Sequence, residues 1–104
     1  MIERVEEIKN DSARPIHVHL EPWGFVCALS PTKTLRVVAR SSTEGSLEVV
    51  REGEVVIVYA WPGATAQAFE GSALVQDCGI PVPDVPKGLS IRGFLGLMFG
   101  SGKG

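Results

Sequence analysis

The chain of 104 residues lacks the features that mark several large protein classes. Its two cysteines, Cys27 and Cys78, are too few and too far apart for a disulfide framework, and neither is part of a Cys-x-x-Cys pair. No stretch has the roughly 18 continuous apolar residues of a membrane-spanning helix, and the charged start MIERVEEIKND does not resemble a signal peptide. We therefore expect a cytoplasmic protein in which both cysteines are small buried side chains.

An excess of positive charge is also missing. The net charge is −2, and phosphate binding needs clustered Lys and Arg, so we expect no nucleic-acid partner. The charge is uneven, because residues 1–84 carry 7 basic and 12 acidic side chains whereas residues 85–104 carry 3 basic and no acidic ones. We therefore treat 1–84 as the folded domain and 85–104 as a chemically different tail.

Motifs for nucleophilic or phosphate chemistry do not occur. The chain has no Gly-x-Ser-x-Gly elbow. The final GLMFGSGKG fails as a phosphate-binding loop, because the motif needs a glycine in place of Leu97 and a hydroxyl in place of Gly104. These absences favour a protein that binds rather than catalyses.

The body of the chain contains short runs rich in Val, Ile, Leu and aromatic residues, each closed by Gly, Pro, Asn, Asp or Ser. This pattern predicts an all-β protein, a single antiparallel β-sandwich of jelly-roll or Ig-like type with about seven or eight short strands. The predicted strands are Glu3–Lys9, Pro15–Glu21, Phe25–Leu29, Thr34–Arg40, Ser46–Arg51, Glu54–Trp61, Ala64–Phe69 and Ala73–Gln76.

Turn residues predict how some of these strands connect. Glu52-Gly53 suggests a hairpin, and Pro62-Gly63 in WPGAT suggests a turn with positive φ at the glycine. Asn10-Asp11-Ser12 suggests a hairpin from the first run into the second. The first run also has apolar residues at helical spacing, so strand and helix both fit it.

Polar side chains alternate with apolar ones in IHVHLE. His17, His19 and Glu21 fall on one face of the predicted strand, and Ile16, Val18 and Leu20 fall on the other. The three polar residues are candidate ligands for one transition metal if Pro22 bends Glu21 inward. The alternative is a solvated sheet face without metal or any other cofactor, as antiparallel sheets often have.

Aromatic side chains beside turns form a second set of candidates. Trp23 and Trp61 each adjoin Pro and Gly, where a ring either closes the end of the core or forms a binding platform. Tyr59 lies two positions before Trp61 in the same predicted strand and therefore on the same face. If that face is open, the pair forms an aromatic shelf for a sugar or peptide.

The tail combines apolar residues with glycines. A proline-rich connector leads into a segment whose apolar residues repeat at helical spacing, and we expect a short helix with one apolar stripe. Its glycines make it unstable alone, so it needs its own sandwich, a second subunit or a membrane surface to fold against. The candidate association residues are Ile91, Phe94, Leu95, Met98 and Phe99.

Two family resemblances follow from these motifs. At LEPWG and YAWPG the chain resembles an uncharacterised group of small bacterial β-sandwich proteins. Over roughly Ile16 to Leu74 this resemblance implies one sandwich domain, but it transfers no activity to the chain. His17, His19 and Glu21 resemble the start of the cupin motif, which implies a jelly roll that holds a metal. The chain has two histidines in all, so the third histidine of that motif is missing.

The sequence thus supports three hypotheses of different classes. The first is a small non-enzymatic binding or accessory β-sandwich, with self-association or a protein partner engaged through the apolar tail. The second is a metal-dependent cupin-like enzyme that uses His17, His19 and Glu21. The third is a membrane-surface accessory protein held through the tail.

Overall fold

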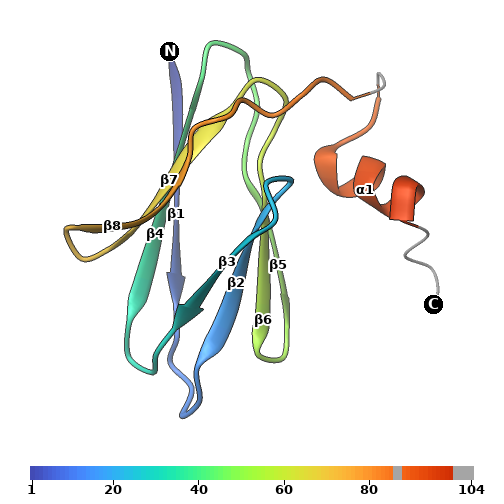
Figure 1. Ribbon diagram of the computed structural model, residues 1–104. Helices are drawn as coiled ribbons and strands as arrows, with labels where there is room; N and C mark the ends of the chain where they lie inside the picture. Colours follow the sequence, from blue (N-terminus) through green and yellow to red (C-terminus); the bar gives the residue numbers. More distant parts are fainter. Residues whose placement is uncertain (86–87, 100–104) are drawn as a thin grey trace.

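The computed structural model describes residues 1–85 and 88–99, and of Met98 and Phe99 it describes the backbone alone. Eight strands form a sandwich of two sheets, which confirms the predicted all-β class (Figure 1). The strands are β1 (Ile2–Lys9), β2 (Ile16–Glu21), β3 (Phe25–Leu29), β4 (Thr34–Ser41), β5 (Glu48–Glu52), β6 (Val55–Tyr59), β7 (Thr65–Glu70) and β8 (Ala73–Cys78). A helix, α1 (Ile91–Phe99), follows them.

Each sheet contains four strands. One has the order β1-β4-β7-β8 and is antiparallel throughout; the other has the order β3-β2-β6-β5. In the second sheet β2 and β6 run parallel, with His17 opposite Val55 and Glu21 opposite Tyr59, whereas the outer pairs are antiparallel. The sandwich is therefore mostly antiparallel, with one parallel pair at the centre of one sheet.

The first segment is a strand, but the hairpin that we predicted at Asn10 is wrong. β1 pairs with β4, and β2 lies in the other sheet, so the chain crosses between sheets at Asn10. The hairpins are β2–β3, β5–β6 and β7–β8. The β5–β6 hairpin confirms the predicted turn, since Glu52 pairs with Val55 and Gly53 has a φ of 62°.

The Asn10 side chain explains why the chain crosses there. Asn10 is buried, and its Nδ2 donates to the carbonyl oxygens of Arg14 at 2.8 Å and Leu29 at 2.9 Å. Its Oδ1 accepts from Ser12 N at 3.0 Å, and its backbone N–H donates to Lys33 O at 2.9 Å. These bonds join the end of β1 to β3 and to the β3–β4 turn, in place of a β1–β2 ladder.

The core lies between the inner faces of the two sheets. Val18 and Val58 face it from one sheet, and the three alanines of the WPGAT region, Ala64, Ala66 and Ala68, face it from the other. These alanines are fully buried within one chain, so the small side chains let the two sheets approach.

The turn after β6 closes one end of the core. Ala64 N donates to Trp61 O at 3.0 Å, and Gly63 has a φ of 89°, which confirms the predicted turn at Pro62-Gly63. Trp61 is 6% exposed, and its indole N–H donates to Thr43 O at 3.0 Å. Gly45 lies against this ring so closely that an added Cβ would overlap the indole.

The connector and α1 continue from this end of the sandwich. Val82 is buried, and its backbone bonds to Gly63 and Ala64 as a further extended segment. Ile91 is 3% exposed and belongs to the same core cluster as Trp61. Lys87 and Lys103, two of the three tail cations, lie outside the described residues. Within residues 1–85 and 88–99, no helix has the length and apolar character needed to span a membrane.

Candidate functional site

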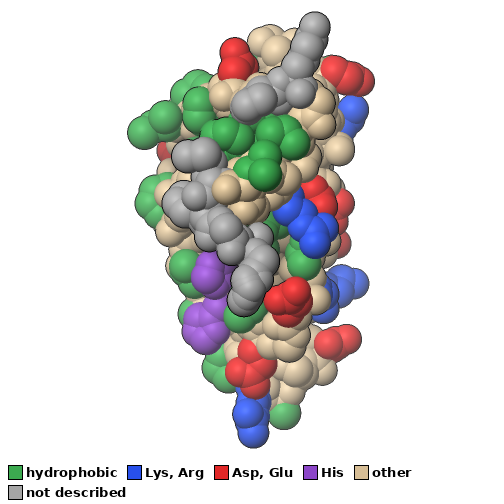
Figure 2. All heavy atoms as spheres, turned by 90° about the vertical axis from the view of Figure 1, so that its right-hand side faces the viewer, with side chains coloured by type: hydrophobic (Ala, Val, Ile, Leu, Met, Phe, Trp, Pro, Cys, Tyr) green, Lys and Arg blue, Asp and Glu red, His purple; other side chains and the backbone are tan. Residues whose placement is uncertain are grey.

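The polar face of β2 lies on the outside of the β3-β2-β6-β5 sheet. Ile16, Val18 and Leu20 are buried, whereas His17 is exposed and His19 and Glu21 are half-buried. Both histidines (purple) are visible at the surface in Figure 2. The predicted alternation of β2 is therefore confirmed.

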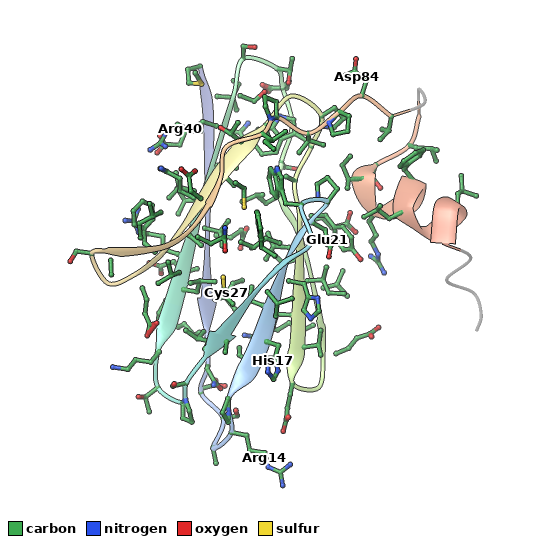
Figure 3. The ribbon with its side chains drawn as sticks, in the orientation of Figure 1. Arg14, His17, Glu21, Cys27, Arg40 and Asp84 are labelled. Carbon is green, nitrogen blue, oxygen red and sulfur yellow. The ribbon has the colours of Figure 1, made fainter. Side chains whose placement is uncertain are left out.

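The three polar residues of β2 do not converge on a metal. Glu21 remains in register with Tyr59, so it stays on the strand, and the turn with the cis Glu21-Pro22 peptide bond follows it. His17 and Glu21 lie near opposite ends of the strand (Figure 3), about 13 Å apart at the usual rise per residue. In the part of the chain that the structure describes, no three His, Cys, Asp or Glu side chains are arranged to hold a metal ion.

Around the histidines, the outer face is largely apolar. Register places Val26 of β3 and Ile57 of β6 on either side of His19, and Val50 of β5 beyond Ile57. Helix α1 lies over the part of this face formed by β5 and β6 (Figure 1).

A pocket of about 520 Å³ lies between α1 and the sheet, and we call it the α1 pocket. Val50 and Ile57 contribute apolar side chains from the sheet, and Leu95 contributes one from the helix. Its full lining is Val50, Glu52, Ile57, Tyr59, Arg92, Leu95 and Gly96. The volume is in the range of pockets that hold small ligands or single side chains.

The charges around this pocket are mostly negative. Arg92 Nη1 donates to Glu48 Oε2 at 2.8 Å, and this hydrogen bond raises the pKa of Arg92 above its ordinary value. Burial raises the pKa of Tyr59; Arg92 opposes the rise, and Glu21, Glu48 and Glu52 add to it. Three carboxylates and one guanidinium therefore act on the Tyr59 hydroxyl.

Glu21 is another of the acidic residues near Tyr59, and it lies on the same strand as the two histidines. Burial raises the pKa of the Glu21 carboxyl above its ordinary value, and the neighbouring His19 partly opposes this effect. A carboxylate that has lost some of its water shell gains more from a bound cation than a fully exposed one.

The aromatic candidates lie in three different environments. Trp61 is in the core, so it does not form a shelf with Tyr59; β6 ends at Tyr59, and the alternation that predicted a shared face does not continue. Trp23 is half-buried, and its indole N–H donates to Ile80 O at 2.6 Å. Tyr59 is half-buried and lines the α1 pocket.

The candidate association residues of the tail also lie in different environments. Ile91 is buried, Leu95 packs against the core cluster and lines the α1 pocket, and Phe94 is half-buried. The side chains of Met98 and Phe99 lie outside the described part of the structure. The tail thus contributes one wall of the α1 pocket through the first two turns of the helix.

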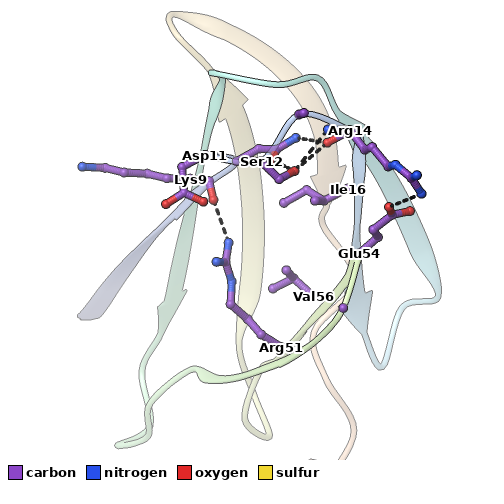
Figure 4. A pocket seen from close by; sticks show the side chains of 11 residues that line it. Lys9, Asp11, Ser12, Arg14, Ile16, Arg51, Glu54 and Val56 are labelled. Carbon is purple, nitrogen blue, oxygen red and sulfur yellow. Dashed lines mark hydrogen bonds and ion pairs between the residues drawn. The ribbon is translucent and has the colours of Figure 1, made fainter.

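A second pocket, of about 320 Å³, lies at the opposite end of the sandwich between the β1–β2 loop and the β5–β6 hairpin (Figure 4). Ile16 and Val56 form its floor. Arg51 Nη2 donates to Lys9 O at 2.7 Å across its opening, and Arg14 and Glu54 form an ion pair at 3.4 Å on its rim. Arg51, Arg14 and Glu54 at this pocket are thus each bonded to a neighbouring group.

Neither cysteine is placed for nucleophilic chemistry. Burial raises the pKa of the Cys27 thiol, and burial followed by the proximity of Cys27 and Asp77 raises the pKa of Cys78 to about 12. A thiol is a nucleophile only as the thiolate, which these positions disfavour. Neither thiol is therefore activated as a nucleophile.

Comparison of the chain with protein-family models, curated proteins and solved structures gives no match. The case for a function therefore rests on the chain's own geometry. Reasoning from sequence found Tyr59 and Leu95 as candidates but missed Val50, Glu52 and Arg92, because these residues come together only when α1 lies on the sheet.

Proposed function

We propose that this protein is a non-enzymatic binding domain, and that the α1 pocket takes a long cationic side chain, lysine or arginine, of a protein partner. The observation that carries the proposal is the composition of this pocket, in which apolar side chains from β5, β6 and α1 lie beside Tyr59, Glu52 and Arg92. Two further carboxylates, Glu21 and Glu48, also act on Tyr59.

The apolar part of the pocket suits the stem of such a side chain. Lysine and arginine bury their methylene groups along apolar surface and keep the charged end beside polar groups. Val50, Ile57 and Leu95 provide that surface. An acidic side chain has a stem too short to use it.

The charge around the pocket favours a cation. Glu21, Glu48 and Glu52 all act on Tyr59, and Arg92 alone opposes them. Arg92 is already bonded to Glu48, so its positive charge is balanced by that carboxylate. Glu21 and Glu52 therefore leave the net charge around the pocket negative. The aromatic face of Tyr59 adds a further site at which a cation is attracted.

Nuclear magnetic resonance titration of the full-length protein tests this function. Nα-acetyl-lysinamide and Nα-acetyl-argininamide should shift the amide signals of Ile57, Tyr59 and Leu95 and saturate in the millimolar range, as expected for about 4 kcal/mol of binding energy from one side chain. Added salt should weaken the response, since one partner is an exposed charge.

Two controls make the test specific. Nα-acetyl-norleucinamide has a similar apolar stem without the charge and should bind about threefold more weakly, a loss of about 0.7 kcal/mol. Glu52→Gln should reduce the response to the cationic amides, whereas Glu44→Gln, in the exposed β4–β5 connection, should not. Equal binding of the norleucine compound, or no saturable shift with any compound, contradicts the proposal.

A further inference from the structure

The sandwich has two open sides where sheet edges face one another. The edge strands are β1 and β8 in one sheet and β3 and β5 in the other. β3 and β8 lie against each other on one side. On the other side β1 and β5 are joined by the hydrogen bond from Arg51 to Lys9 O.

The β1/β5 side carries features that prevent further strand pairing. Arg4 Nε donates to Gly45 O at 3.1 Å, so the β4–β5 connection is held against β1. Glu6 lies on the inner face of β1 opposite Val37 and is half-buried. Charged side chains and inward-pointing charges on an edge strand disfavour the addition of another strand.

On the other side, the edge strand β3 lacks these features, although Glu70 lines the groove beside it. β3 reads FVCAL and contains no charged residue, and Val26 is 51% exposed. Val26 and Val75 line one groove, which connects the two edges. Most of the exposed large apolar side chains of the described residues lie on this side: Phe25, Val26, Leu74, Val75 and Ile80.

We propose that β3 is the pairing edge of a homodimer, in which β3 of a second copy pairs with it in antiparallel register centred on Cys27. This pairing goes beyond the function proposed for the α1 pocket and does not depend on it. It joins two four-stranded β3-β2-β6-β5 sheets into one continuous sheet. Val26 then lies opposite Ala28 of the second copy, and the exposed apolar residues of β8 lie beside the new contact.

The absence of charge favours a second copy as the occupant. A two-fold antiparallel contact places each residue near its symmetry counterpart, so an edge strand with like charges at symmetric positions repels its copy. In β5 the same pairing would bring Glu48 opposite Glu52 of the second copy. β8 contains Asp77 and adjoins an irregularity in its pairing with β7, so β3 is the edge best suited to self-pairing.

Sedimentation velocity with one matched pair of variants tests the dimer. The wild-type chain should approach twice its 11.1 kDa mass as its concentration rises. Val26→Lys should raise the dimer dissociation constant at least tenfold. Val5→Lys places the same charge on the edge strand β1, at a valine that is 46% exposed, and should leave the dimer intact.

Hydrogen exchange locates the contact. The amides of Val26 and Ala28 should exchange more slowly in the wild-type dimer than in Val26→Lys, whereas the amides of β5 should not differ. If Val26→Lys fails to fold, Ala28→Lys, at another exposed position of β3, gives the same comparison.

Three results overturn the proposal. The first is a wild-type chain that stays monomeric up to about millimolar concentration. The second is a dimer that persists in both β3 variants. The third is a dimer lost in Leu97→Lys, on the exposed face of α1, but kept in Val26→Lys, which would assign self-association to the helix. The lysinamide titration of the α1 pocket is measured separately, so each proposal can fail alone.

Discussion

The two open sides of the sandwich differ in the contacts that cover their sheet edges. On the β1/β5 side, Arg51 and Arg4 donate to backbone carbonyls of neighbouring segments. On the β3/β8 side, the edges approach each other and β3 is uncharged, with Cys27 half-buried and Cys78 buried between the two edges. The difference indicates that one side is closed by polar bonds within the chain and the other by apolar contact, which a second molecule can extend.

The largest effect is expected where the β4–β5 connection closes the charged side. In Gly45→Ala the new methyl group would overlap the indole ring of Trp61, which is fixed by its bond to Thr43 O. We expect the free energy of unfolding to fall by about 3 kcal/mol, as for overpacked cores. Urea denaturation measures it.

Gly79, which follows β8 on the apolar side, provides the matched control for Gly45. An added Cβ there meets only Asp77 Oδ1 at 3.7 Å, an ordinary contact. Gly79→Ala should change the free energy of unfolding by less than about 0.5 kcal/mol. If both alanine variants were as stable as the wild type, the closeness of Gly45 to the Trp61 ring would not be important for stability.

A chain that ends at Asp84 tests whether both sides persist without α1. The strands and the buried Val82 precede this point, so we expect a β-type circular dichroism spectrum and one cooperative melt. The loss of buried Ile91 should lower the free energy of unfolding by about 2 kcal/mol. Ile91→Ala in the full chain should have an effect of the same order. An unfolded product would show that the tail is required to complete the core.

Alkaline pH should affect the apolar side through Cys78. Its pKa of about 12 exceeds the ordinary thiol pKa of about 8.5, so between these values the folded chain binds more protons than the unfolded chain. The contribution of Cys78 to stability is therefore fully present below about pH 8.5 and declines as the pH rises toward 12.

By pH 10 this linkage should lower the free energy of unfolding by up to about 2 kcal/mol. Cys78→Ala should give a shallower decline above pH 8.5 when both proteins are unfolded in urea across the pH range. An equal slope in both proteins would mean that Cys78 ionises as easily when folded as when unfolded.

The smallest effect concerns the polar bond across the charged side. Arg51→Ala removes the donor to Lys9 O and should lower the free energy of unfolding by about 0.5 to 1 kcal/mol, because the guanidinium is exposed. Arg14→Ala removes an ion pair of 3.4 Å whose arginine side chain is largely exposed and should have no measurable effect. Equal effects in thermal melts would contradict a special role for Arg51.

Most of the fold follows from local patterns in the sequence. Alternation of apolar and polar residues located β2, and turn chemistry located the Gly53 and Gly63 turns, because these features depend on neighbours in the chain. The Asn10 region was mispredicted for the opposite reason. Its partners are the carbonyls of Leu29 and Lys33, which sequence order places far away.

The site was harder to predict than the fold. Tyr59 was identified by its spacing from Trp61 in the predicted strand, but Trp61 is part of the core because β6 has already ended there. The α1 pocket depends on how a helix lies on a sheet, and neither element alone encodes its lining. Glu52 and Arg92 lie forty positions apart in the chain, and the sequence alone does not distinguish them from other charged surface residues.

The parallel pairing of β2 with β6 also has a consequence for how the chain folds as it is made. Residues 17–21 pair with residues 55–59, so the central pair of that sheet cannot form until more than half of the chain has been synthesised. Pairings of such long sequence separation place all-β proteins among the slower two-state folders, in the millisecond to second range. During synthesis, one side of β2 therefore remains unpaired until β6 has been made. Until then the uncharged edge of β3 is exposed in an incomplete sandwich.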